Sequence, residues 1–163
     1  ASLFIELFDS PSTHVRVRNT SFVGNSVHYG GLTSLGSAFM LDIFDGSDGT
    51  ALHVSQCIFV DNLGCVGSAL RVEAPLDTLV HKEVDAPPEY VYRTSVIVEG
   101  CIVRNHGDYP QEASTEGDSE CRREAMSFIS GNITVLDTIL SDNNSTAVVV
   151  DATASLLLSN GQC

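Results

Sequence analysis

Short runs in which apolar and polar residues alternate recur along this chain in a fixed order. Each unit of about 22 residues has an apolar alternation, a small residue, a large apolar residue and an Asn, followed by Ala and a second alternation. The first part occurs at 15–25, 52–62, 96–105 and 133–143, and the second at 38–42, 69–73, 125–128 and 147–151. In the third copy Asn105 stands one place early. The pattern predicts two short strands in every copy.

The alternating runs are rich in Val, Ile, Leu and Phe and are bounded by Gly, Asn, Asp and Ser, which is typical of strands. Outside the repeat, no segment shows an extended helical period, so we expect nearly no helix. A unit this short cannot bury its apolar face alone, so the copies must stack, with equivalent strands in parallel about 4.8 Å apart. We therefore predict an all-β fold, a parallel β-helix (solenoid) with about four coils plus partial terminal coils, in a single domain over 1–163.

Two insertions interrupt the repeat, at about 74–94 and 106–124. The first contains two apolar runs, 79–80 and 90–92, which could form a small hairpin. The second is rich in Gly, Asp, Glu and Ser. Such loops are either disordered excursions or binding surfaces. Tyr90, Tyr92 and Tyr109 could supply a flat surface for a sugar or a protein, although local packing also explains them.

The repeat resembles a known family at two places. Phe22-Val-Gly-Asn25 is followed by Gly30-Gly31-Leu32, and Phe59-Val-Asp-Asn62 is followed by Gly67-Ser68-Ala69-Leu70. These segments resemble the paired FxxN and GGA[ILV] repeats of chlamydial polymorphic outer-membrane proteins and of related pectin-lyase-like extracellular proteins. The resemblance implies a right-handed β-helix with its Asn residues stacked inside a turn. The superfamily contains lyases, hydrolases, adhesins and passive fibres, so this fold does not choose a function.

The acidic composition of the chain limits the classes of partner that it is expected to bind. The 163 residues are 43% hydrophobic, with 8 basic and 21 acidic side chains and a formal charge of −13. Binding to nucleic acid or anionic lipid is driven by Lys and Arg, so neither is expected. No apolar run approaches the roughly 18 residues of a membrane span.

The two ends of the sequence fall inside a coil. Residues 2–6 match a second alternation, and residues 156–163 begin a fifth unit. Because bare β-edges pair with other chains, the open coil ends are expected to contact either the rest of a parent polypeptide or neighbouring subunits.

Two pairs of cysteines share repeat positions. Cys57 and Cys101 occupy one column, and Cys65 and Cys121 each stand four residues before an Ala in another. Stacking brings such Cα atoms to about 5 Å, within disulfide range, so we predict the bonds Cys57–Cys101 and Cys65–Cys121. A column of small buried residues is the alternative for the first pair, since Thr residues fill it in the flanking copies. Cys163 is left without a partner.

Several Asn-X-Ser/Thr triplets are candidate glycosylation sites. Asn19, Asn132 and Asn144 are the expected acceptors, whereas Asn143 falls in the stacked Asn column and should be buried. Together with the cysteine columns, these triplets predict a secreted, extracellular or cell-surface glycoprotein.

Candidate chemistry is sparse. Asp42, Asp45 and Asp48 form a weak candidate calcium loop whose spacing departs from that of an EF-hand, and no other cofactor is expected. A repeat column contains Glu6, Asp42, Glu73 and Asp151, which we interpret as surface carboxylates that splay apart. The only compact set with an acid, an imidazole and a base is Arg104, Asn105, His106, Gly107 and Asp108, for which a solvated loop is the favoured interpretation.

Two functions remain open. The first is a non-enzymatic structural or adhesive segment of a larger surface or filament-forming glycoprotein. The alternative is a carbohydrate-active β-helix that binds or cleaves a polymer containing uronic acids. A sugar-cleaving groove should collect acids, basic residues and aromatics on one face, whereas the outward positions include no acid. Those positions are Arg16, His53, Ile97 and Thr134. The sequence therefore favours the non-enzymatic function.

Overall fold

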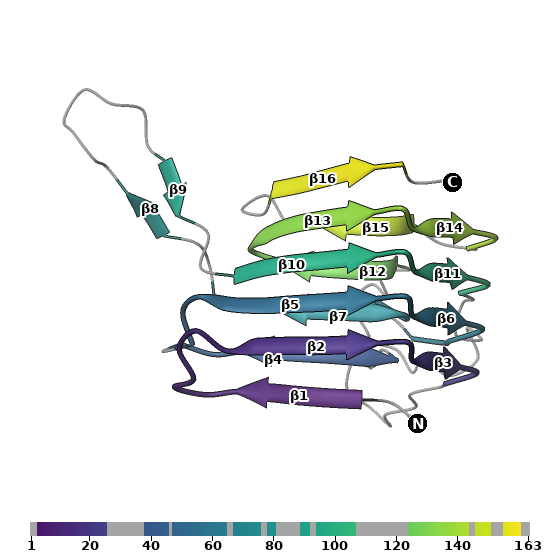
Figure 1. Ribbon diagram of the computed structural model, residues 1–163, viewed down its shortest axis with the longest axis horizontal. Helices are drawn as coiled ribbons and strands as arrows, with labels where there is room; N and C mark the ends of the chain where they lie inside the picture. The colour runs from purple at the N-terminus through teal and green to yellow at the C-terminus, as the bar shows by residue number, and fades with distance from the viewer. Residues whose placement is uncertain are drawn as a thin grey trace, which may run out of the picture.

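The structure, a computed structural model, describes 3–25, 38–45, 47–64, 67–75, 78–80, 89–91, 94–106, 124–143, 146–150 and 155–160. These residues form an all-β fold with no helix (Figure 1). Correspondingly, none of them belongs to a helix long and apolar enough to cross a membrane.

Fourteen of the strands form three parallel sheets. Sheet A contains β1 (Leu3–Leu7), β4 (Phe39–Ile43), β7 (Leu70–Glu73), β12 (Glu124–Ile129) and β15 (Thr146–Val150). Sheet B contains β2 (His14–Arg18), β5 (Thr50–Ser55), β10 (Thr94–Glu99), β13 (Asn132–Leu136) and β16 (Ser155–Ser159). Sheet C contains β3 (Ser21–Val23), β6 (Ile58–Val60), β11 (Ile102–Arg104) and β14 (Ile139–Ser141).

After β1, the chain visits sheets B, C and A in the same order four times (Figure 1). We number these passages repeats 1 to 4, beginning at β2, β5, β10 and β13. Each strand pairs with its equivalents in the neighbouring repeats, as Val15 with Leu52 and Leu52 with Val96. This arrangement is compatible with a parallel β-helix. The prediction of two strands per repeat was wrong by one, because the three-residue strands of sheet C are too short to show an alternation.

The predicted hairpin in the first insertion is confirmed. β8 (Thr78–Val80) pairs antiparallel with β9 (Glu89–Val91), with Leu79 opposite Tyr90. Figure 1 shows this hairpin to one side of the three sheets. Tyr92 and Tyr109 lie outside the described residues, and the full extents of both insertions stay predictions.

Two corners of every repeat use left-handed backbone. The residue that follows each sheet B strand has a φ between 47° and 60°, and the residue that follows each sheet C strand has a φ between 52° and 63°. The first set is Asn19, Gln56, Gly100, Asp137 and Asn160, and the second is Gly24, Asp61, Asn105 and Asp142. Asn, Asp and Gly tolerate this region best, which explains their recurrence at these corners. Between sheets B and C, a single left-handed residue turns the chain sharply from one sheet into the next.

All three sheets contribute to one hydrophobic core. The apolar columns of sheets B and C are chemically uniform along the stack. Val17, Val54, Val98 and Val135 form one such column, and Phe22, Phe59, Val103 and Leu140 form another. The Phe22 and Phe59 rings stack at 4.9 Å between centroids. In-register stacking thus buries like against like.

A ladder of polar side chains lies in the turn after sheet C, where the sequence predicted stacked Asn residues. Asn62 Oδ1 accepts hydrogen bonds from the backbone N and Nδ2 of Asn25, and Asn143 Oδ1 accepts one from the backbone N of His106. In repeat 3 the ladder position is occupied by His106, which is completely buried, and not by Asn105, which is exposed at the left-handed corner. The expectation that Asn105 belongs to the ladder one place early was therefore wrong, because an imidazole fills the amide's place.

Replacing His106 with Asn should remove a loss of stability on acidification. Burial lowers the pKa of His106, and its two ring nitrogens lie 3.2 and 3.3 Å from the carbonyl oxygens of Asn62 and Phe59. Unfolded His106 gains a proton as the pH falls through about 6.5, while the folded chain resists it, so stability is full above that pH and falls below it.

Urea midpoints of the wild type and His106→Asn at about pH 7.5 and 5.5 measure this difference. The raised pKa of Asp42 acts in the opposite direction but contributes equally to both proteins. The exposed His14→Asn variant is the matched control. Parallel pH dependences in the wild type and His106→Asn would contradict the prediction.

Candidate functional site

A groove of about 570 Å³ on the outer face of sheet B is the candidate site. It lies where the strands end and the chain turns toward sheet C. Its lining consists of charged and polar residues from all four repeats, namely Arg16, Arg18, His53, Ser55, Gln56, Glu99, Gly100 and Asp137. The site is thus assembled from residues that are up to 121 positions apart, from Arg16 to Asp137.

Strand alternation and register bring these side chains together. Outward positions on β2 and β5 pair Arg16 with His53, and those on β5 and β10 pair Ser55 with Glu99. The Nε2 atom of His53 lies 3.2 Å from Oε2 of Glu99, which connects repeats 2 and 3. Both side chains are more than a third exposed, so this contact orients the imidazole and adds little stability.

The charges in the groove are separated by sign. Both guanidinium groups come from β2 in repeat 1, whereas the carboxylates come from Glu99 in repeat 3 and Asp137 in repeat 4. His53 stands between them. An anionic group would therefore bind at the β2 end, beside Arg16 and Arg18, and a hydroxyl or cationic group at the other end.

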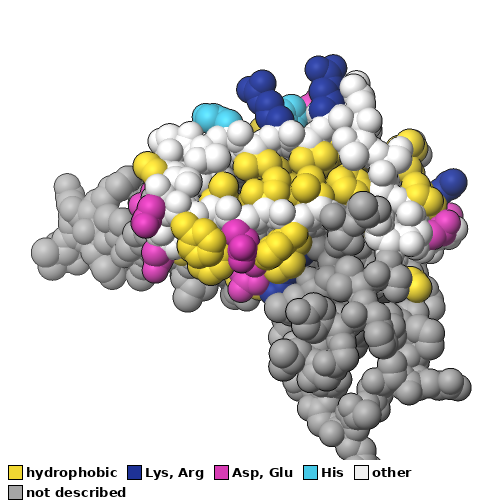
Figure 2. Space-filling view, turned by 90° about the horizontal axis from the view of Figure 1, so that it is seen from below, with side chains coloured by type: hydrophobic (Ala, Val, Ile, Leu, Met, Phe, Trp, Pro, Cys, Tyr) yellow, Lys and Arg dark blue, Asp and Glu magenta, His cyan; other side chains and the backbone are white. Residues whose placement is uncertain are grey.

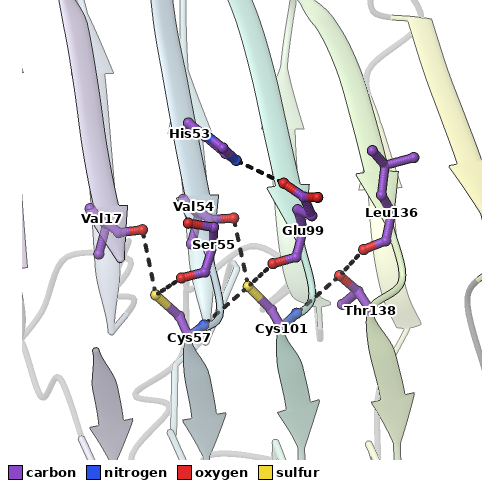
Figure 3. Close-up of polar contacts among 9 residues, drawn as sticks. All are labelled: Val17, His53, Val54, Ser55, Cys57, Glu99, Cys101, Leu136 and Thr138. Carbon is purple, nitrogen blue, oxygen red and sulfur yellow. Dashed lines mark hydrogen bonds and ion pairs between the residues drawn. The ribbon is translucent and has the colours of Figure 1, made fainter. Parts of the chain in front are cut away.

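Small side chains bind the backbone at the corners next to the groove, and Figure 3 shows three of them, Cys57, Cys101 and Thr138. In each repeat, the residue after the left-handed corner donates a hydrogen bond to the carbonyl two residues earlier. The four donors are Thr20, Cys57, Cys101 and Thr138, and their acceptors are Arg18, Ser55, Glu99 and Leu136. Three of these acceptor carbonyls belong to groove residues. The column therefore holds the corner that presents the groove side chains.

The structure does not contain the predicted disulfide between Cys57 and Cys101. The column exists, but both residues are buried free thiols. Cys101 Sγ accepts a hydrogen bond from the Cys57 backbone N at 3.4 Å, and Figure 3 shows the two side chains lying parallel. Equivalent atoms of in-register parallel strands are about 4.8 Å apart, whereas bonded cysteines bring their Cβ atoms to about 3.8 Å. The alternative of small buried residues describes this column. Cys65, Cys121 and Cys163 lie outside the described residues.

Both thiols should resist modification in the folded protein. Cys57 and Cys101 are each 1% exposed, and burial raises the pKa of Cys101 to about 11, so thiolate is scarce at neutral pH. Maleimide labelling followed by peptide mapping should find these two positions unlabelled natively and fully labelled in denaturant. A Cys57→Thr/Cys101→Thr variant should fold normally, since Thr occupies the same column in repeats 1 and 4. Native labelling, or a Cys57–Cys101 peptide under nonreducing conditions, would contradict this.

The predicted glycosylation sites have the following positions. Asn19 is exposed at a left-handed corner, and Asn132 is exposed in β13, with Oδ1 accepting a hydrogen bond from Ser155. Asn143 lies in the ladder, half-buried. Asn144 lies outside the described residues. Asn19 and Asn132 are therefore the two accessible acceptors in the described part of the chain.

The residues of the predicted calcium loop and of the compact set lie in the following places. Asp42 lies on β4, whereas Asp45 and Asp48 are in the connection to β5, and no group of three metal-binding side chains is found among the described residues. In the compact set, Arg104 is exposed and His106 points into the core, so the two diverge. Gly107 and Asp108 lie outside the described residues.

The sequence had missed the acids of the groove. The sequence prediction rests on one outward position per repeat, whereas the next outward position on each strand supplies Arg18, Ser55 and Glu99. Asp137 belongs to the left-handed corner column, which the apolar pattern does not mark. The signal for Glu99 is its place at the second outward position of its strand, two residues after Ile97.

No protein-family model, no curated protein and no solved structure matches this chain. The class of the protein is therefore defined by the structure itself: an all-β protein with parallel strands in three stacked sheets.

Proposed function

We propose that the chain forms a right-handed parallel β-helix and serves as a non-enzymatic structural or adhesive segment of a larger extracellular, surface or filament-forming glycoprotein. The fixed order of sheets B, C and A supports the coiled path, and parallel crossovers are right-handed in nearly all proteins. The FxxN and GGA[ILV] resemblance points in the same direction. Exposed Asn19 and Asn132 are suitable glycan acceptors for such a protein.

One observation carries the non-enzymatic proposal: on sheet B the buried columns are uniformly apolar, while the outward columns change chemistry from repeat to repeat. The outward column that begins at Arg16 continues with His53, Ile97, Thr134 and Leu157. A scaffold needs only its core to repeat, and its surface is free to vary. The groove, with its paired arginines, is then the adhesive contact, and an anionic extracellular polymer is its ligand.

A second candidate, a carbohydrate-active β-helix, is favoured by the presence of acids, bases and an imidazole in one groove. In that case His53, oriented by Glu99, would be the acid or base, and Arg16 and Arg18 would bind a uronate carboxylate. The close His53–Glu99 contact argues for the first proposal, because it leaves Glu99 less available as an independent catalytic acid.

The two proposals are separated by assaying binding and cleavage of polygalacturonate and alginate. We expect salt-sensitive binding that Arg16→Ala/Arg18→Ala abolishes, with no release of unsaturated products or reducing ends. Arg104→Ala, which removes an exposed arginine from sheet C, is the matched control. Product release that Glu99→Gln abolishes would establish the enzymatic function, and binding that is unaffected by the double variant would overturn the adhesive groove.

A further inference from the structure

Exposed aromatic side chains surround carboxylates on the outer face of sheet A. Phe4 and Phe8 are 54% and 56% exposed and flank Glu6 along β1, while Phe44 is 39% exposed just beyond β4. The Phe8 and Phe44 rings stack at 4.2 Å between centroids. Figure 2 shows hydrophobic side chains on both sides of acidic ones on the end of the stack seen from below. We call the set Phe4, Glu6, Phe8, Asp42 and Phe44 the acidic patch.

The acidic patch carries more negative than positive charge. Glu6, Asp42 and Glu73 stand opposite one another on β1, β4 and β7, as the sequence predicted, and like charges at this spacing repel. In the five strands of sheet A, Arg71 is the only Lys or Arg, and its Nη2 is bonded to Glu73 Oε2 at 2.6 Å. Buried Oδ1 of Asp42 has no hydrogen-bond partner. Burial raises the pKa of Asp42 to about 6, the carboxylates of Glu73 and Glu6 add to the rise, and the Arg71 guanidinium opposes it. A cation between Glu6 and Asp42 would relieve this repulsion.

The outer face of sheet C has the complementary composition. Val23, Ile58 and Ile139 are 58%, 38% and 39% exposed. Arg104 lies on the same face, in register with Val60 and Ser141, and is exposed. Its guanidinium forms no ion pair in the described part of the chain. We call the set Val23, Ile58, Arg104 and Ile139 the basic patch. It places one guanidinium among aliphatic side chains, as the acidic patch places carboxylates among aromatic ones.

We propose that the basic patch of one copy docks on the acidic patch of another, with Arg104 entering between Glu6 and Asp42 and the aliphatic side chains covering the phenylalanines. The two patches lie on different sheets, so each copy can make both contacts at once. Such a heterologous contact repeats from copy to copy and builds an open assembly. Apart from the three leucines of β16, the two patches account for every large apolar side chain that is exposed in the described residues.

Other occupants fit less well. The described metal-binding side chains form no cluster that could hold an ion here, and an ion would leave the aromatic rings uncovered. Among the described residues, the other exposed arginines are on β2, which has His14, Arg16 and Arg18 at its outward positions with no apolar side chain between them. The basic patch is therefore the surface of a second copy that matches both the charge and the apolar character.

Charge reversal tests the contact. Sedimentation velocity over a micromolar concentration series, at about 0.15 M ionic strength, should show growth of large species for the wild type. Arg104→Glu and Glu6→Lys should each raise the concentration needed for assembly about tenfold or more, because each places like charges together. The double variant Arg104→Glu/Glu6→Lys should assemble again. Arg16→Glu, an equal charge change on β2, is the matched control.

Mixing the two single variants gives a second, independent readout. The intact basic patch of Glu6→Lys fits the intact acidic patch of Arg104→Glu, and the two reversed patches also attract each other. A mixture should therefore regain the assembly that neither single variant shows alone. Assembly of both single variants at the wild-type concentration, a wild type that stays monomeric, or a double variant that fails to recover while remaining folded by circular dichroism would overturn the inference. This inference extends the proposed structural role, but its failure would leave the groove proposal, which is tested at Arg16 and Arg18, unaffected.

Discussion

Phe59→Ala is expected to lower the free energy of unfolding by about 4 kcal/mol, within the range for truncating a fully buried Phe. Phe59 is 0% exposed and lies in the centre of the stack, with its ring against that of Phe22. The parallel strands of repeats 1 and 3 hold the backbone on both sides, so the surroundings can collapse only slightly into the cavity. Urea unfolding followed by far-ultraviolet circular dichroism measures the effect.

Phe59→Leu is the matched control. Leu140 occupies the same column in repeat 4, so the site geometry accommodates a branched aliphatic side chain. The expected loss is about 1 kcal/mol. If Phe59→Ala were as mild as Phe59→Leu, the column would not be packed as described.

Asn62→Ala is expected to cost about 3 kcal/mol, because it removes three buried hydrogen bonds at once. Asn62 is 0% exposed, and its Oδ1 accepts from the backbone N and Nδ2 of Asn25 at 2.9 and 2.8 Å. Its own Nδ2 donates to Phe22 O at 2.9 Å. After truncation, the backbone N and the Nδ2 of Asn25 lose their acceptor, although Asn25 is only 8% exposed.

The half-buried Asn143→Ala is the comparison for Asn62→Ala. Asn143 makes the same types of bond, to His106 N and Val103 O, but water can replace them, so the expected loss is about 1 kcal/mol. Thermal and urea unfolding of both variants tests the difference. Equal losses at the two positions would mean that burial does not set the strength of the ladder.

The sequence predicted which residues align in one column better than it predicted the contacts that those residues make. Val17 and Val54, or Phe22 and Phe59, could be aligned from spacing alone, because in-register stacking repeats the same buried environment in every copy. The three-residue strands of sheet C could not be recognised, since a single buried side chain between two outward ones defines no period. His106 was missed for another reason. An imidazole can take the place of an amide in the ladder, but the sequence prediction looked only for Asn and therefore chose Asn105.

The groove depended on information that apolar periodicity does not contain. Glu99 and Asp137 are ordinary surface acids in the sequence, and only the register of β5, β10 and β13 brings them to His53 and the arginines. Cys57 and Cys101 were correctly placed as neighbours, but a shared column fixes Cα spacing without fixing the direction of the side chains. Bond formation requires that direction.

The left-handed corners determine how such a protein can change in length. Because Asn19, Gln56, Gly100, Asp137 and Asn160 turn the chain at equivalent positions, a residue added within a strand before its corner would turn the following side chains of that strand to the opposite face. A whole repeat, by contrast, can be inserted or lost without altering a single corner. Length in this architecture is therefore quantised, and variation by whole repeats would change the reach of the molecule while leaving its cross-section intact.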